Sequence, residues 1–211
     1  MEQSLRGLSL DAFLDALADG SATPGGGAAA ALVGSAAAAL VSMVCRLTVG
    51  RPKFAAVEAQ VQQILDEAEA VRARLQRGID EDAAAYESVM AAVRLPKDGE
   101  AQARARTAAL QAALKEATRP PLAAARDCGR LLELARAAVE LVNPSPISDL
   151  VVAAELARAA LAGALENVEI NLAAIKDDAF VGALRAEVTE ATGARARLAE
   201  QVRARAQARR G

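Results

Sequence analysis

Most of the chain repeats its hydrophobic residues every three or four positions, the spacing that places them on one face of an α-helix. Charged and polar residues fill the opposite face, so each predicted helix needs an apolar partner. No stretch alternates apolar and polar residues for long, which argues against β-strands. The predicted amphipathic helices span residues 8–19, 57–93, 100–118, 120–142, 148–171 and 179–208.

Short polar side chains and helix breakers mark the borders of these helices. Ser9 and Ser148 each precede an apolar periodic stretch, so both are predicted N-caps. Gly20 is a candidate end for the first helix, and Pro120 interrupts the pattern between the fourth and fifth.

One segment, residues 28–45, has no charged residue at all. A helix that is apolar all round belongs in the centre of a bundle or in a membrane. Its alanines and glycines are only weakly lipophilic, and the amphipathic helices all need an apolar partner, so we favour the centre of a bundle over a membrane span. Gly34, Ala38 and Ser42 recur at i, i+4 and i+8 and would let neighbouring helices approach closely.

The predicted fold class is therefore all-α: a single bundle of long helices around a buried apolar central helix. A length of 211 residues suits one domain, and no linker divides residues 1–211. Aromatic residues make up only 2% of the chain, so Ala, Leu and Val must build the core. Ala-rich faces could also pack across a subunit interface, and a homodimer is the commonest oligomer.

Charge and cysteine content narrow the possible partners and compartment. The net charge of −2 gives no indication of nucleic-acid binding, and we interpret the basic stretch 195–210 as the solvated face of a last helix. Cys45 and Cys128 have no CxxC spacing, and both lie in apolar helical contexts. The first 13 residues do not resemble a secretory signal. We therefore expect a reducing, cytoplasmic compartment.

The chain has no histidine. This excludes histidine-based triads, histidine metal ligands and histidine general bases, and we expect no metal site. Any acid–base chemistry must come from Asp, Glu, Lys, Tyr or the backbone.

A glycine run, Gly25, Gly26 and Gly27, directly precedes the uncharged helix. Glycines let the backbone approach a ligand closely, and the first turn of a helix offers free N–H groups to an anion. The run matches neither a P-loop nor a dinucleotide fingerprint, so a flexible loop that merely enters the helix is an equal alternative.

Carboxylates occur in the middle of the longest predicted helix, where Asp is a poor helix former. Asp82 and Tyr86 are one turn apart on one face, beside the apolar stripe, whereas Asp80 lies about 200° away on the helical wheel. A solvated acidic face is the alternative interpretation.

Two further polar sets follow. Ser148 and Asp149 stand at a predicted helix start, where capping alone would explain them. Asn167 and Asn171 share a face of an otherwise apolar helix, and Asp177 follows closely, which suggests a polar function for that face.

Five motifs in this order resemble one family. The motifs TPGGG, SMV-x-x-LT-x-G, DEDAAAYESVMAA-x-x-LP, ISD and NVEINLAAIKD resemble the cyclodeaminase/cyclohydrolase family of folate one-carbon metabolism, from about residue 9 to residue 198. The resemblance implies an all-helical homodimer with folate bound near the subunit interface. It also implies site residues at the matching positions: Gly25, Gly26, Gly27, Asp80, Asp82, Tyr86, Ser148, Asp149, Asn167, Asn171 and Asp177. Lys53 is the candidate for the folate tail, although Pro52 departs from the basic run that relatives often carry there.

The implied chemistry suits a site without histidine. The bridging carbon of 5,10-methenyltetrahydrofolate is a cation, so its hydrolysis needs a water, a carboxylate to accept a proton, and groups that orient the substrate. No metal, nucleotide or cofactor beyond the tetrahydrofolate substrate is expected. Our hypothesis makes Asp82 or Asp149 the proton acceptor, with Asp80, Asn167 and Asn171 positioning the substrate.

The sequence leaves two alternative functions open. Formimidoyltetrahydrofolate cyclodeaminase chemistry involves the same carbon and could use the same carboxylates. We favour the cyclohydrolase because SMVCRLTVG looks closer to the stand-alone cyclohydrolases and the chain has no transferase domain. A non-enzymatic helical dimerisation module would explain the Ala-rich helices, but not the two asparagines or the glycine run.

Overall fold

The computed structural model describes residues 4–210, apart from the side chains of residues 190–194 and 196. This part of the chain contains helices and no β-strand, which confirms the predicted all-α class. Two short 3-10 helices, η1 (Leu5–Gly7) and η2 (Pro52–Val57), precede α1 and α3. The α-helices are α1 (Leu10–Ala18), α2 (Gly26–Arg46), α3 (Glu58–Val93), α4 (Glu100–Ala117), α5 (Arg119–Leu141), α6 (Ile147–Ala174) and α7 (Asp178–Arg210).

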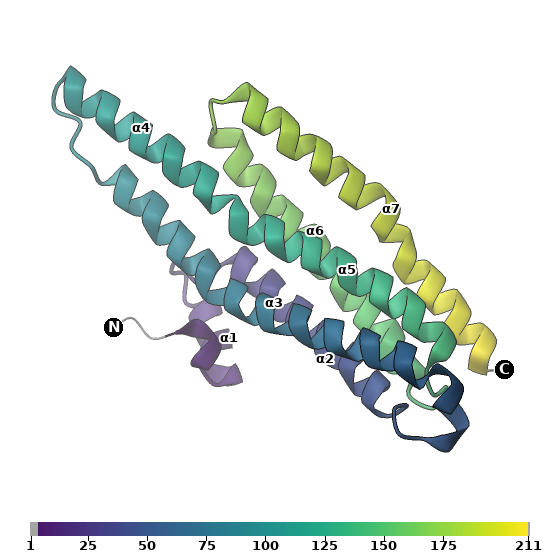
Figure 1. Ribbon diagram of the computed structural model, residues 1–211. Coiled ribbons are helices and arrows are strands. Elements are labelled where there is room, and N and C mark those ends of the chain that lie inside the picture. Colours follow the sequence, from purple (N-terminus) through teal and green to yellow (C-terminus); the bar gives the residue numbers. More distant parts are fainter. Residues whose placement is uncertain (1–3, 211) are drawn as a thin grey trace.

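The long helices lie roughly parallel or antiparallel to one another in one bundle (Figure 1). Helices α4 and α5 follow each other almost in line, with α3 beside them and α7 along the opposite edge. Helix α6 lies behind α5 and α2 lies behind α3, and α2 and α6 pack against each other and against α5. The short α1 sits apart, against α2 and α3.

One predicted N-cap is confirmed and the other is wrong. The Ser9 hydroxyl accepts a hydrogen bond from the Ala12 N–H at 3.2 Å, as an N-cap does. Ser148, by contrast, lies inside the first turn of α6, which begins at Ile147 with Pro146 in the N-cap position. Pro146 cannot donate a hydrogen bond, and its fixed φ is compatible with a helix entry, so the helix starts earlier than a serine-based prediction places it.

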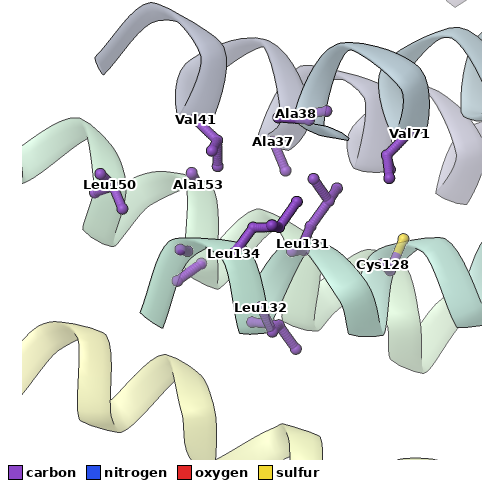
Figure 2. Close-up of a cluster of buried hydrophobic side chains, with 14 of the residues drawn as sticks. Ala37, Ala38, Val41, Val71, Cys128, Leu131, Leu132, Leu134, Leu150 and Ala153 are labelled. Atoms are coloured by element: carbon purple, nitrogen blue, oxygen red, sulfur yellow. The ribbon is translucent and has the colours of Figure 1, made fainter. Parts of the chain in front are cut away.

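The uncharged helix α2 packs against α3, α5 and α6. A Cβ atom on Gly34 would lie 2.8 Å from Sγ of Cys128, so only glycine permits this approach to α5. Ala38 and Ser42 are also fully buried, in agreement with the predicted close packing along that stripe. Figure 2 shows the same contact further along, where Val41 of α2 points towards Leu134 of α5.

The prediction that α2 is buried all round is only partly correct. Ala36, Ala39 and Met43 recur at i, i+3 and i+7 and are exposed. Although α2 is long and apolar enough to cross a membrane, 61% of its most apolar window is buried inside the bundle. The helix is therefore a core helix with one uncovered apolar stripe.

The basic C-terminal stretch packs onto the bundle through ion pairs. Arg205 donates to Glu140 of α5 at 2.7 Å, and Arg203 pairs with Glu155 of α6. Arg209 donates to the carbonyl oxygens of Val139 and Val142 at the end of α5, which have no further helical partner. The basic face of residues 195–210 is therefore paired with α5 and α6, whereas the sequence suggested a purely solvated face.

Candidate active site

The glycine run and Asp82 meet where α2 begins. A Cβ atom on Gly27 would lie 2.1 Å from Oδ1 of Asp82 and 2.5 Å from its Cγ, so any side chain at this position would displace the carboxylate. A Cβ atom on Gly26 would lie 3.3 Å from Nδ2 of Asn167. The groups that approach these two glycines closely are thus the protein's own polar side chains, and a close approach of the glycines to a ligand stays a prediction.

Burial raises the pKa of Asp82, because the charged carboxylate is removed from water. The Ala28 N–H in the first turn of α2 partly offsets this by lowering the same pKa. The positive end of a helix favours a carboxylate in this position. The result is an ionisable acid with a pKa above its ordinary value of 3.8.

A hollow of about 290 Å³ opens over this carboxylate. Tyr86 of α3 and the two asparagines of α6 line it together with Asp82, so the structure brings together four of the nine predicted polar residues. Among the described residues that line the hollow, only Asp82 carries a charge. The full lining is Ala22, Thr23, Gly25, Gly26, Gly27, Asp82, Ala85, Tyr86, Val89, Ala117, Asn167, Ile170 and Asn171.

Both asparagines use their amide N–H groups on backbone carbonyls. Nδ2 of Asn167 donates to the Gly163 oxygen at 2.8 Å, and Nδ2 of Asn171 donates to the Ala117 oxygen at 2.9 Å. These bonds fix the two side chains and leave the amide oxygens as hydrogen-bond acceptors for a ligand. The bond to Ala117 also joins α6 to the end of α4. Sequence reasoning missed Ala117 and Ile170, because a backbone carbonyl and an exposed apolar side chain give no pattern in the chain.

The described residues bring no group of three or more Cys, Asp or Glu side chains into an arrangement that could hold a metal ion.

Asp80 lies outside the hollow. Its carboxylate accepts a hydrogen bond from the Ser4 hydroxyl at 2.7 Å and pairs with Nε of Arg6 at 3.2 Å. Because Asp80 and Asp82 differ by two helix positions, they point to different sides of α3, as the helical wheel indicated.

Asp177 also lies outside the hollow, at the start of α7. Its carboxylate accepts a hydrogen bond from the Phe180 N–H at 3.0 Å and binds Nζ of Lys115 at 2.6 Å. The Lys115 ammonium, followed by the Phe180 N–H, holds the pKa of Asp177 below its usual value. Within the chain Asp177 is therefore an N-cap and an ion-pair partner.

Ser148, Asp149 and Lys53 lie at the other end of the bundle. Asp149 precedes Asn167 by 18 residues on one straight helix, which separates them by about 27 Å. Lys53 precedes the start of α3, and Asp82 lies near its far end. A single chain therefore does not bring these three residues to Asp82, although the sequence pattern placed them in one set.

A buried pair of polar residues organises that distant end. Thr48, at the end of α2, accepts a hydrogen bond from the Asn143 N–H at 3.0 Å and donates to the Val44 oxygen at 3.0 Å. This contact fixes the loop that carries Ser148 and Asp149 into α6. It accounts for the Leu-Thr motif, which sequence reasoning noted without a role.

Comparison with known proteins assigns the family. The model of the family described as formiminotransferase-cyclodeaminase matches residues 9–190. The chain belongs to this family. Relatives of the formiminotransferase-cyclodeaminase family include both stand-alone and fused proteins. The methenyltetrahydrofolate cyclohydrolase of Methylorubrum extorquens is 44% identical over 172 residues, which cover 82% of this chain and 83% of that protein.

Two further members are named for the cyclodeaminase. The formimidoyltransferase-cyclodeaminase of Rattus norvegicus is 37% identical over 179 residues, which cover 85% of this chain but 33% of that protein. The crystal structure of the formiminotetrahydrofolate cyclodeaminase of Thermotoga maritima superposes with a TM-score of 0.86 at 30% identity, over 97% of this chain and 98% of that one. The bundle described above is therefore the fold of the formiminotransferase-cyclodeaminase family.

Proposed function

We propose that this protein hydrolyses 5,10-methenyltetrahydrofolate to 10-formyltetrahydrofolate. The similarity to the Methylorubrum extorquens cyclohydrolase, 44% identical over most of both chains, supports this reaction. The observation that carries the proposal is the Asp82 carboxylate, which is half-buried against Gly27 and is the charged member of the lining of a hollow.

The reaction uses Asp82 as its proton acceptor. A water oxygen attacks the cationic bridging carbon while Asp82 takes a proton from that water. The bond between this carbon and N5 then breaks, N5 takes the proton back from Asp82, and the hydroxyl proton of the intermediate leaves to solvent as the formyl group forms on N10. The carboxylate also stabilises the cationic substrate before attack.

The other lining groups orient the substrate. The amide oxygens of Asn167 and Asn171 accept hydrogen bonds, which suits the N–H donors of a pterin ring. Tyr86 supplies an aromatic surface one helical turn from Asp82. This chemistry needs no cofactor or metal in addition to the tetrahydrofolate substrate.

We further propose that the protein acts as a homodimer through the uncovered stripes of α2 and α6. Helices α2 and α6 pack against each other, and each keeps large apolar side chains exposed: Met43 of α2 and Val152 and Ile170 of α6. Ile170 is 70% exposed and also lines the candidate site, which supports a site beside the proposed dimer face. An apolar stripe of this length usually marks an interface.

Pairing of two subunits about a two-fold axis would give a role to the predicted site residues at the other end of the bundle from Asp82. An antiparallel arrangement of the stripes would bring Lys53, Ser148 and Asp149 of one subunit towards Asp82 of the other. In this proposal Asp149 assists the proton transfer or holds the substrate cation, and Lys53 binds the carboxylates of the folate tail. Asp177, which binds Lys115 outside the hollow, has no direct contact with the substrate in this proposal.

The cyclodeaminase reaction is the second candidate, because the Thermotoga maritima protein of the same fold bears that name. In that reaction the same carboxylate, Asp82, would take part in the proton transfer to the nitrogen that leaves as ammonia. The free, buried thiols of Cys45 and Cys128 suit either enzyme in a reducing cytoplasm.

The two reactions are separated by one paired assay. The loss of methenyltetrahydrofolate absorbance is followed in parallel with ammonia release from formiminotetrahydrofolate. We expect hydrolysis without ammonia release, and Asp82→Asn should abolish it. Ammonia release with no enzymatic loss of absorbance would instead establish the cyclodeaminase, and neither activity would favour a dimerisation module.

A further inference from the structure

The residues before α2 form a strap, residues 4–25, whose two ends meet the same part of α3. At its start, Asp80 of α3 accepts the Ser4 hydroxyl at 2.7 Å and the Arg6 N–H at 3.3 Å, and it pairs with Nε of Arg6 at 3.2 Å. All three contacts converge on one carboxylate. Asp80 therefore fastens the beginning of the strap to α3.

The end of the strap is the glycine run of the candidate site. Thr23 lies in a hollow of about 300 Å³ together with Ser4, Leu5 and Asp80, so the two ends of the strap stand next to each other. Thr23 also lines the hollow above Asp82. Thr23 thus separates the Asp80 fastening from the candidate site.

Between its ends the strap packs against the bundle through a small apolar cluster centred on Phe13, against which Leu5, Leu8 and Leu17 of the strap also pack. Phe13 of α1 is buried, and it packs against Ala28 and Ala31 of α2 and Ile79 of α3. Leu10 and Leu14 on the same short helix are 65% and 48% exposed. An open hollow of about 540 Å³ remains between the strap and the helices beneath it. This cluster holds the middle of the strap at α1, and the Asp80 contacts hold its beginning.

We infer that Asp80 is a positioning residue, which fastens the strap and thereby sets the position of the glycine run beside the bound substrate. It does not touch the reacting atoms. The proposed function is needed only to interpret the kinetic part of the test below, because the fastening itself can be measured without any substrate.

The primary test is backbone hydrogen exchange of Asp80→Ala. Amides of residues 10–25 should exchange about tenfold faster than in the wild type, because an exposed ion pair and its hydrogen bonds are lost, while amides of α5 and α6 keep their rates. The matched control is Asp66→Ala, on the same helix. Asp66 is exposed and, among the described residues, accepts a side-chain hydrogen bond from Gln62 of its own helix and from none of the strap, so exchange in the strap should not change. Unchanged exchange in Asp80→Ala would overturn the inference.

The kinetic test separates positioning from chemistry. Asp80→Ala should raise KM several-fold with kcat within about twofold and the pH profile unchanged, because Asp82 is intact. A fall in kcat of about a hundredfold at unchanged KM would overturn the inference and make Asp80 part of the chemistry. If Asp80→Ala does not fold, the double variant Ser4→Ala with Arg6→Ala removes the same fastening from the strap side and must give the same two results. If no folate reaction is found at all, the exchange experiment still decides the fastening.

Discussion

The Cβ position of Gly27 lies 2.1 Å from Oδ1 of Asp82, closer than any real side-chain contact. Gly27→Ala must therefore displace the carboxylate or the start of α2. We expect a loss of activity of at least tenfold and a destabilisation of about 1–3 kcal/mol, as for other overpacked sites. Thermal unfolding and steady-state kinetics measure both effects.

Gly78→Ala is the matched control for this substitution. Its nearest neighbour would be Cβ of Ala31 at 3.8 Å, an ordinary contact in the middle of α3. Alanine is the better helix former, so this variant should be more stable by about 0.5–1 kcal/mol. A Gly27→Ala protein that matches Gly78→Ala in stability would contradict the observed contact.

Asp82→Asn should separate activity from stability. Removal of the proton acceptor should lower kcat by about 10²–10⁴-fold. Because the pKa of Asp82 is raised in the folded protein, this carboxyl weakens the folded state progressively as the pH rises above the ordinary value of 3.8, and fully once the pH exceeds the raised pKa. The variant should therefore unfold at the same or a higher temperature than the wild type at pH 7, and this difference should shrink as the pH falls towards 3.8, the ordinary value.

The pH dependence of the wild type gives an independent check. Because Asp82 must be ionised to accept a proton, kcat/KM should fall on the acid side with an apparent pKa above 3.8. An acid limb at or below the ordinary value would show that a solvated carboxylate, and not Asp82, is the base.

Asp177→Ala should behave as a structural change. The variant loses the N-cap of α7 and the partner of Lys115, so Tm should fall by a few degrees while KM changes little. The lowered pKa of Asp177 stabilises the fold above its ordinary value of 3.8, and this contribution is lost as the pH falls through the lowered pKa. The difference in Tm should therefore disappear in strong acid. A large rise in KM with normal Tm would restore a direct contact with substrate.

Ala36→Glu tests the proposed dimer face. A charge in the middle of the uncovered stripe of α2 should convert the dimer to a monomer in light-scattering measurements at micromolar concentration. Ala105→Glu, which places the same charge on an exposed position of α4, should leave the oligomeric state unchanged. Identical masses for both variants would place the interface elsewhere.

Mixing two inactive variants tests whether the site is shared. If Asp149 of one subunit serves Asp82 of the other, a heterodimer of Asp82→Asn and Asp149→Asn contains one intact site. After unfolding and refolding together in equal amounts, the mixture should recover about one quarter of wild-type activity. No recovery, from variants that still form dimers, would show that Asp149 does not act across the interface.

Sequence patterns predicted the helices well because long amphipathic periods are a strong signal. The predicted ends of α3 at 57 and 93 agree with the observed Glu58–Val93, and Ser9 is the N-cap expected. The start of α6 was misplaced because Pro146 precedes Ser148 and permits an earlier entry. The open stripe of α2 could not be foreseen either, since an uncharged helix gives no sign of which face stays uncovered.

The candidate site was predicted in part for a similar reason. Asn167, Asn171, Asp82 and the glycines were recognised individually, and the structure brings them to one hollow. Helical periodicity shows on which face of a helix a residue lies. It does not show near which end of the bundle that residue lies. Asp149 was for that reason grouped with residues about 27 Å away.

The arrangement at the start of α2 affects which inhibitors and buffer ions can bind there. In many proteins a glycine run before a helix leaves N–H groups free to capture phosphate or sulfate. Here the Asp82 carboxylate already takes that place at Gly27 and Ala28. Inorganic anions are therefore repelled from the pocket, and compounds that carry a delocalised positive charge at the bridging position should compete best with substrate.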